Sequence, residues 1–158
     1  MSFKIRYLKI RVVLSLLAAV LLIIAPFSAG AEPATIKATV VLSGASQPEK
    51  IKTLTLEIAR TENEHARGLM YRREMARDSG MLFIFSENKE RSFWMKNTPL
   101  SLDLIFLDDR KTVVGVAANA TPFSTEGISV NSPSRYVIEV NAGVAKELGI
   151  ITGSKINF

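Results

Sequence analysis

The chain has 158 residues, 47% hydrophobic and 22% charged, with no cysteine, one histidine and a formal net charge of +5 at pH 7. That length fits one ordinary domain, and the apolar fraction is too high for a chain that is disordered throughout. The absence of cysteine excludes disulfides, thiolate nucleophiles and zinc ribbons, and the single histidine excludes sites with several imidazole ligands.

The N-terminal segment has the layout of a secretory signal peptide. Four cations among the first eleven residues precede a predominantly apolar run over 12–25, and the small residues Ala29-Gly30-Ala31 follow it. We expect residues 1–31 to be the signal peptide, with cleavage near Ala31 and a periplasmic or secreted product. The alternative is an uncleaved inner-membrane anchor over 12–25, although about 20 apolar residues are needed to span a bilayer.

Cleavage there would remove most of the positive charge. The loss of those four cations leaves 16 Lys+Arg against 15 Asp+Glu, a net charge of +1. The basic composition therefore gives no case for a nucleic-acid partner. We expect contact with a membrane only through an uncleaved N-terminal segment.

Residues 32–50 are predicted to form a linker that contains one peripheral strand near 36–42. Alternation of polar and apolar residues over 53–58 predicts a half-buried strand. Thr61-Glu62-Asn63-Glu64 has the spacing of a capping box and predicts the start of a short amphipathic helix. We expect about two and a half turns, with an apolar face formed by Ala66, Leu69 and Met70.

From Gly80 onward the pattern is mainly that of β-strands. The apolar run over 81–85 is typical of a strand buried on both faces. A long loop is expected over 119–134 and a short helical turn over 142–148. Further strands are expected over 92–95, 100–107, 112–118, 135–140 and 155–158. Many short strands with one early helix predict a mainly β domain over 51–158, a compact antiparallel β-barrel or jelly-roll-like sandwich.

Several phrases occur in a characteristic order along this domain. They are Arg67-Gly68-Leu69-Met70, Gly80-Met81-Leu82-Phe83, Phe93-Trp94-Met95-Lys96-Asn97-Thr98 followed by Leu102-Asp103, Ile138-Glu139-Val140 and Ala142-Gly143. Together they resemble the DUF192 (UPF0127) family of prokaryotic, often exported proteins over roughly residues 52–158. The resemblance implies a compact single-domain β-barrel or jelly-roll-like fold, and it implies no agreed activity.

Two positions depart from the pattern of that family. The hairpin at Asp109-Arg110 lacks the expected glycine, and Ile128-Ser129-Val130 stands where an aromatic residue is commoner. Both positions lie in turns or loops, so we expect the fold to be kept.

Trp94, Lys96 and Asn97 form a first candidate binding set at the end of a predicted strand. An indole face, a cation and an amide can stack against and orient a small polar ligand such as a sugar or a carboxylate. The same residues also suit a structural role. Trp94 would then pack in the core, Asn97 would cap the turn before Pro99, and Lys96 would be solvated.

Asp103 and Glu139 lie on otherwise apolar strands, where a buried carboxylate needs a partner. Lys96, Arg67 and Arg91 are the candidate partners of Asp103. If the two carboxyl groups met across a cleft, they would suit general acid and base catalysis, as in glycoside hydrolysis. Structural ion pairs are the competing interpretation.

Four methionines, Met70, Met75, Met81 and Met95, fall within 26 residues and close to His65. Thioethers with an imidazole suit Cu(I). The same methionines occupy apolar periodic positions, where they fill gaps in a core, so we expect no resident metal or other cofactor.

The sequence thus favours an exported, non-enzymatic β-domain that binds an unknown small polar ligand or a periplasmic protein. The candidate binding residues are Arg67, Trp94, Lys96, Asn97, Asp103 and Glu139. The first alternative is a hydrolase that uses Asp103 and Glu139. The second is a periplasmic Cu(I)-binding protein whose ligands would be Met70, Met81, Met95 and His65.

Overall fold

The computed structural model describes residues 33–41 and 52–158, so the predicted signal peptide and most of the predicted linker lie outside the described residues. Within the described ranges, no helix is both long and apolar enough to cross a membrane. The elements there, in chain order, are β1 (Thr35–Val41), β2 (Lys52–Ala59), α1 (Glu62–Arg67), β3 (Ser79–Lys89), β4 (Leu102–Leu107), β5 (Val113–Ala120), β6 (Ser134–Asn141), α2 (Val144–Glu147) and β7 (Lys155–Asn157).

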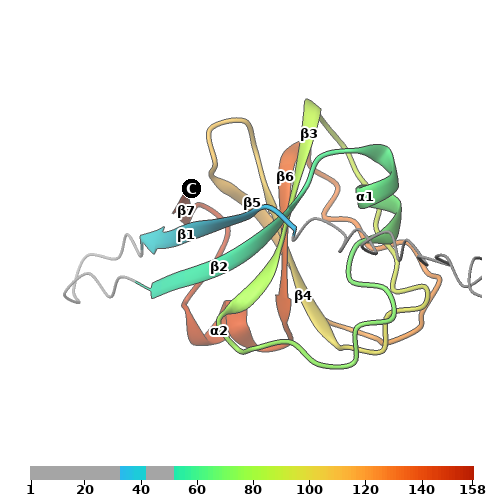
Figure 1. The fold of residues 1–158 in the computed structure, drawn as a ribbon. Helices are drawn as coiled ribbons and strands as arrows, with labels where there is room; N and C mark the ends of the chain where they lie inside the picture. The colour runs from blue at the N-terminus through green and yellow to red at the C-terminus, as the bar shows by residue number, and fades with distance from the viewer. Residues whose placement is uncertain (1–32, 42–51) are drawn as a thin grey trace, which may run out of the picture. The chain divides into compact units, whose positions relative to one another are not determined.

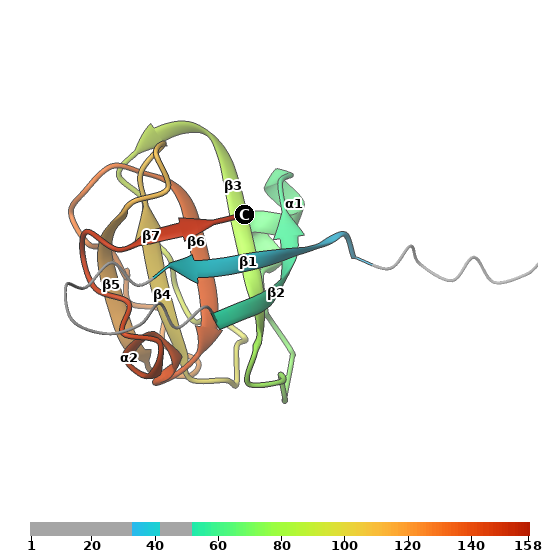
Figure 2. The same ribbon diagram turned by 90° about the vertical axis from the view of Figure 1, so that its left-hand side faces the viewer.

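The strands form one curled sheet in the order β5-β4-β6-β3-β2-β1-β7 (Figure 1). Its two edge strands come together at one end, where Thr112 and Lys155 form an isolated bridge. The mainly β, barrel-like fold predicted from the sequence is therefore confirmed, as a half-barrel. In Figure 2, β1, β2 and β7 cross in front of β3, β4 and β6, which shows how strongly the sheet curls.

One strand pair departs from the antiparallel arrangement predicted from the sequence. β2 and β3 are parallel, whereas the other neighbouring pairs are antiparallel. The prediction was wrong here because residues 60–78, which include α1, form a crossover. A crossover of a dozen or more residues returns the chain to the same end of the sheet, as parallel pairing requires.

The central strands are buried on both faces. Every residue of β4 is buried, as is β3 from Gly80 to Phe83. One face packs against Val144 and Ala145 of α2, in a cluster that also holds Ile105, Ile138 and Leu56. We call it the α2 face. The opposite face packs against Leu69 and Met95, in a cluster that also holds Phe83, Leu104 and Val137. We call it the Leu69 face.

The predicted capping box is present at the start of α1. Thr61 Oγ1 accepts a hydrogen bond from the Glu64 amide at 3.2 Å, and Glu64 Oε2 accepts one from the Thr61 amide at 2.8 Å. The helix is shorter than predicted, because Gly68 turns away at φ +46° and ψ −133°. None of the helical residues is buried.

The predicted strand over 92–95 is reduced to a single bridge between Phe93 and Ile128. The two residues exchange backbone hydrogen bonds of 2.8 and 2.9 Å, which join two loops over the Leu69 face. Phe93 and Met95 therefore resemble strand residues because both pack against the sheet, although the segment itself is not one of its strands.

The β4–β5 hairpin turns without the expected glycine. Asp108 Oδ1 accepts hydrogen bonds from the backbone amides of Arg110 at 2.9 Å and Thr112 at 2.8 Å. Lys111 takes the left-handed conformation, with φ +60°. The aspartate side chain thus organises the turn by bonding to nearby backbone amides.

We predict that Gly80→Ala destabilises the fold by about 3 kcal/mol, the upper end of the usual cost of overpacking a well-packed core, because the added atom would meet backbone. An added Cβ would lie 2.3 Å from the Glu139 carbonyl oxygen and 3.0 Å from Leu56 Cδ2, so β3 and β6 would have to separate. Urea unfolding measures the loss. The control Ser79→Ala, at the adjacent position, should change the free energy of unfolding by less than about 0.5 kcal/mol. Equal stability of Gly80→Ala and the unchanged protein would contradict this packing.

Candidate functional site

A cavity of about 690 Å³ opens on the Leu69 face of the sheet. Its lining comes from α1 and the residues after it, β3, the segment 90–98, the loop 125–127 and β6. Aromatic rings dominate the walls: His65, Phe83, Phe85, Phe93 and Trp94. The charged side chains in the lining are Arg67, Glu90, Arg91 and Glu139.

The end of α1 passes directly over the carboxyl group of Glu139. A Cβ added to Gly68 would lie 3.3 Å from Phe83 Cζ and 3.9 Å from Glu139 Oε2. Glycine therefore does two things here: it accepts the positive φ that ends the helix, and it leaves room for the Phe83 ring. The adjacent Leu69 is buried and anchors the chain to the sheet.

Glu139 is more than nine-tenths buried in an apolar environment. It lies opposite Met81 on β3 and opposite Leu104 on β4. Within residues 33–41 and 52–158, no hydrogen bond or ion pair engages its carboxyl group. Burial raises the pKa of Glu139 from the ordinary value of 4.5 to about 8, with no opposing contribution from a nearby cation. The side chain is therefore mostly protonated at neutral pH.

The aromatic walls are held in place by contacts among the rings. Phe93 meets Phe83 edge-to-face with 5.2 Å between ring centroids, and it meets Phe106 in the same way at 5.8 Å. The His65 ring lies 4.3 Å from Phe85, and its Nε2 is 3.1 Å from the carbonyl oxygen of Ala59. These contacts preorganise the cavity, because such pairs favour defined ring orientations.

The two arginines of the cavity differ in their surroundings. The Arg91 guanidinium stacks 3.5 Å from the Phe85 ring centroid and donates to the backbone carbonyls of Ser134 and Glu87. Burial lowers the pKa of Arg91, and the charge of Glu87 partly opposes this. Arg67, by contrast, is the exposed last residue of α1, and its guanidinium has no partner among the described residues.

Three of the predicted binding residues, Arg67, Trp94 and Glu139, line this one cavity. Trp94 is 49% exposed, so it lies at the rim and not in the core. Lys96 and Asn97 are outside the lining. The Nζ of Lys96 is 5.2 Å from the Trp94 ring centroid, and Asn97 Nδ2 donates to the hydroxyl of Tyr71 at 2.9 Å.

Asp103 faces away from the cavity, so the predicted carboxylate pair is not formed. In the β4–β6 pairing, Asp103 lies opposite Val140 and Leu104 lies opposite Glu139. Residues that lie opposite each other share a face, and successive residues alternate between faces. Asp103 therefore points into the α2 face and Glu139 into the Leu69 face. The proposal that these two groups act together as acid and base was wrong.

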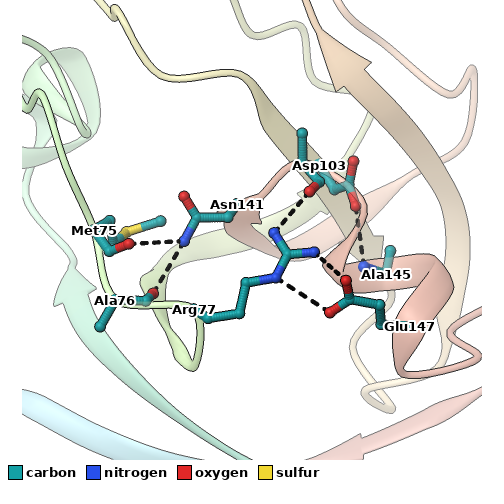
Figure 3. A network of polar contacts seen from close by, with 8 residues as sticks. Met75, Ala76, Arg77, Asp103, Asn141, Ala145 and Glu147 are labelled. Atoms are coloured by element: carbon teal, nitrogen blue, oxygen red, sulfur yellow. Dashed lines mark hydrogen bonds and ion pairs between the residues drawn. The ribbon is translucent and has the colours of Figure 1, made fainter.

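Asp103 is instead part of a structural network on the α2 face (Figure 3). Its carboxylate accepts hydrogen bonds from the backbone amides of Asn119 at 2.9 Å and Ala145 at 3.0 Å. Arg77 reaches toward the same region, pairs with Glu147 and donates to a backbone carbonyl of the 142–143 turn. These backbone amides take the place of the partners predicted from the sequence, which were Lys96, Arg67 and Arg91.

The residues proposed for Cu(I) fall into two groups. His65 and Met70 line the cavity, and the Met70 sulfur is 3.9 Å from Asn97 Nδ2. Met81 and Met95 are buried in the hydrophobic cluster beneath it. In the described ranges, no three His, Cys, Asp or Glu side chains gather as a metal site would require. Copper binding through methionine stays a prediction.

The three phenylalanines of the aromatic walls, Phe83, Phe85 and Phe93, were not predicted as part of a site. Phe83 and Phe85 lie two apart on β3, so they share its Leu69 face, and this spacing was a signal that both would reach the same space. Phe93 and Arg91 gave no comparable signal, because their position depends on how the 90–98 segment folds over the sheet.

We predict that Glu139 gives the stability of the protein a distinctive pH dependence. Between pH 4.5 and about 8 the folded state still holds a proton on Glu139 that the unfolded chain has already released. The contribution of Glu139 is therefore complete below pH 4.5 and is lost as the pH rises to about 8, at up to roughly 1.4 kcal/mol per pH unit. Urea unfolding at pH 5.5, 6.5 and 7.5 should show this slope in the unchanged protein and lose it in Glu139→Gln.

The exposed Glu126 provides the matched control for that series. Glu126→Gln should leave the pH profile as it is in the unchanged protein. Parallel profiles for Glu139→Gln and the unchanged protein would mean that Glu139 is not protonated by burial.

Comparison with known proteins identifies the family to which this chain is similar. The DUF192 family, described as "Uncharacterized ACR", matches residues 44–158. A protein from Sinorhizobium meliloti named a "putative transcription regulator" is 37% identical in sequence. Its structure superposes with a TM-score of 0.74 over 78% of this chain and 93% of that chain. A protein of unknown function from Novosphingobium aromaticivorans is 33% identical, with a TM-score of 0.72 over 82% of this chain and 94% of that chain. No curated protein gives a significant match. The chain belongs to the DUF192 family.

Proposed function

We propose that this protein binds a small polar ligand in the aromatic cavity around Glu139. The observation that supports this best is Glu139, a residue only 5% exposed whose carboxyl group borders the cavity and has no partner among the described residues. A carboxyl group in apolar surroundings is stabilised by a hydrogen-bond partner, and the cavity gives a ligand access to this one. A ligand that supplies the missing partner is the explanation proposed here.

The size and lining of the cavity favour a small molecule over a macromolecule. Its volume of about 690 Å³ is within the range of roughly 300 to 1,000 Å³ that is common for small-molecule sites. Aromatic walls with a few polar groups are also typical of such sites. Trp94 at the rim adds a flat surface against which a ligand can stack.

Binding accounts for this cavity without a catalytic pair. The hydrolase considered from the sequence needs Asp103 beside Glu139, and these side chains lie on opposite faces of the sheet. After the proposed cleavage the charge is nearly balanced, which does not favour contact with nucleic acid.

Export is part of the same proposal, because residues 1–31 have a signal-peptide pattern. Cell fractionation should recover the protein from the periplasm or the medium, and N-terminal sequencing should find a start at Glu32. A start at Met1 with recovery in the inner membrane would indicate the anchored form. Recovery of the uncleaved chain in the cytoplasm would contradict export.

We predict that a thermal-shift screen of the purified protein finds a stabilising class among sugars, small carboxylates, amines, amino acids and phosphates. A ligand at 100 times its Kd adds about 2.7 kcal/mol of stability, which raises the Tm of a domain this small by several degrees. Trp94→Ala and Arg67→Ala should each weaken the affinity for that ligand at least tenfold.

Two exposed residues outside the lining serve as matched controls for these variants. Phe123→Ala and Arg73→Ala remove side chains of similar size and charge and should leave the affinity unchanged. If no class shifts the Tm, or if the control variants weaken binding as much as the cavity variants, the proposed site is wrong.

A further inference from the structure

The floor of the cavity holds an acid without a counter-ion. The side chains around Glu139 are apolar on each packed strand, with Met81 and Phe83 on β3 and Leu104 on β4. Gly68, which lies over the carboxyl group, contributes no side chain. Arg67, Glu90, Arg91 and His65 line the same cavity, and none of them forms a hydrogen bond or ion pair with Glu139.

An ammonium group complements this floor better than a neutral or anionic group. A cation beside a desolvated carboxylate forms a charge-assisted hydrogen bond, which is about twice as strong as a neutral one. Aromatic rings add to the attraction, because a cation interacts favourably with the face of a nearby ring. An anionic group would gain neither contribution.

The rim of the cavity carries a cation, whereas its floor carries an acid. Arg67 is exposed at the end of α1, and its guanidinium has no partner among the described residues. A free guanidinium can bind a carboxylate through two parallel hydrogen bonds. Arg91 is less available, because it already donates to two backbone carbonyls and stacks on Phe85.

We infer that the ligand is a small zwitterion of the amino-acid type, with its ammonium group on Glu139 and its carboxylate on Arg67. This inference rests on the proposed function, since it assigns the chemistry of a ligand to the same cavity.

Binding of such a ligand is coupled to release of a proton. The ammonium pairs with ionised Glu139, and burial raises the pKa of that carboxyl to about 8 in the free protein. Binding at pH 6 to 7 therefore expels the proton of Glu139 into solution. The affinity should rise by up to about tenfold per pH unit toward pH 8 and level off above it. A neutral ligand would bind protonated Glu139 without proton release.

Titration calorimetry with matched compounds tests the inference. The probes are 4-aminobutyrate, butylamine and butyrate, then phenylalanine, phenethylamine and 3-phenylpropionate, with glucose as a neutral polyol. In at least one series the zwitterion should bind at least tenfold more tightly than both analogues. Repeating the titration at pH 7 in two buffers with different ionisation enthalpies should show release of close to one proton.

Variants of the two charged residues separate their contributions. Glu139→Gln should abolish proton release and remove the pH dependence of the affinity. Arg67→Ala should weaken the zwitterion at least tenfold and leave the affinity of the matched amine unchanged. The control Arg73→Ala should alter neither affinity.

The outcomes distinguish this inference from the proposed function. Glucose bound without proton release, with no zwitterion bound, overturns the inference and leaves a small-ligand site. An amine that binds as tightly as its zwitterion overturns the role of Arg67. If neither these probes nor any class in the thermal-shift screen binds, the inference and the proposed function both fail.

Discussion

Burial of β3, β4 and β6 on both faces is the constraint on which the rest of the structure depends. Because apolar clusters cover each side of these strands, a carboxylate on them is largely shielded from bulk solvent and must be accommodated either by protein groups or at a cavity. The curl of the sheet creates this situation, since it brings β1, β2 and β7 across one side while loops from 60–78, 90–100 and 121–133 cover the other. Two acids are placed in this environment, and they are accommodated in different ways.

Asp103 and Glu139 show how neighbouring positions in one sheet acquire different roles. Asp103 is fully buried, and two backbone amides satisfy its carboxylate, one of them at the start of α2. That aspartate fixes a short helix to the sheet, which is a structural role. Glu139 is almost as deeply buried, yet it borders a cavity and no described group bonds to it. The difference follows from pairing register alone, because β4 and β6 place the two side chains on opposite faces.

Local features of the structure could be predicted from the sequence, and non-local ones could not. The capping box at Thr61 was predictable because its hydrogen bonds span three residues, and the strands followed from short-range alternation. Trp94 and Glu139 were identified because an aromatic group at a strand end and a carboxyl group on an apolar strand each need an explanation, and Arg67 was named as a possible partner of a buried carboxylate. The parallel pairing of β2 with β3, and the separation of Asp103 from Glu139, depend on which strands meet and in what register. Residues close in sequence do not encode that choice, and Phe93 resembled a strand residue because packing onto a sheet imposes a similar alternation.

The pairing of β6 also restricts how this chain can change in length. Insertion or deletion of one residue within β6 upstream of Glu139, with the residues before the change kept in register, would shift Glu139 by one position and exchange the faces of Glu139 and its neighbours. The carboxyl group would then enter the cluster against α2, and a hydrophobic side chain such as that of Ile138 or Val140 would take its place beneath Gly68. A change of two residues would preserve the faces. Which side chain borders the cavity thus depends on whether the length of β6 changes by an odd or an even number of residues. Length changes in the surrounding loops do not alter the alternation of side chains along the strand.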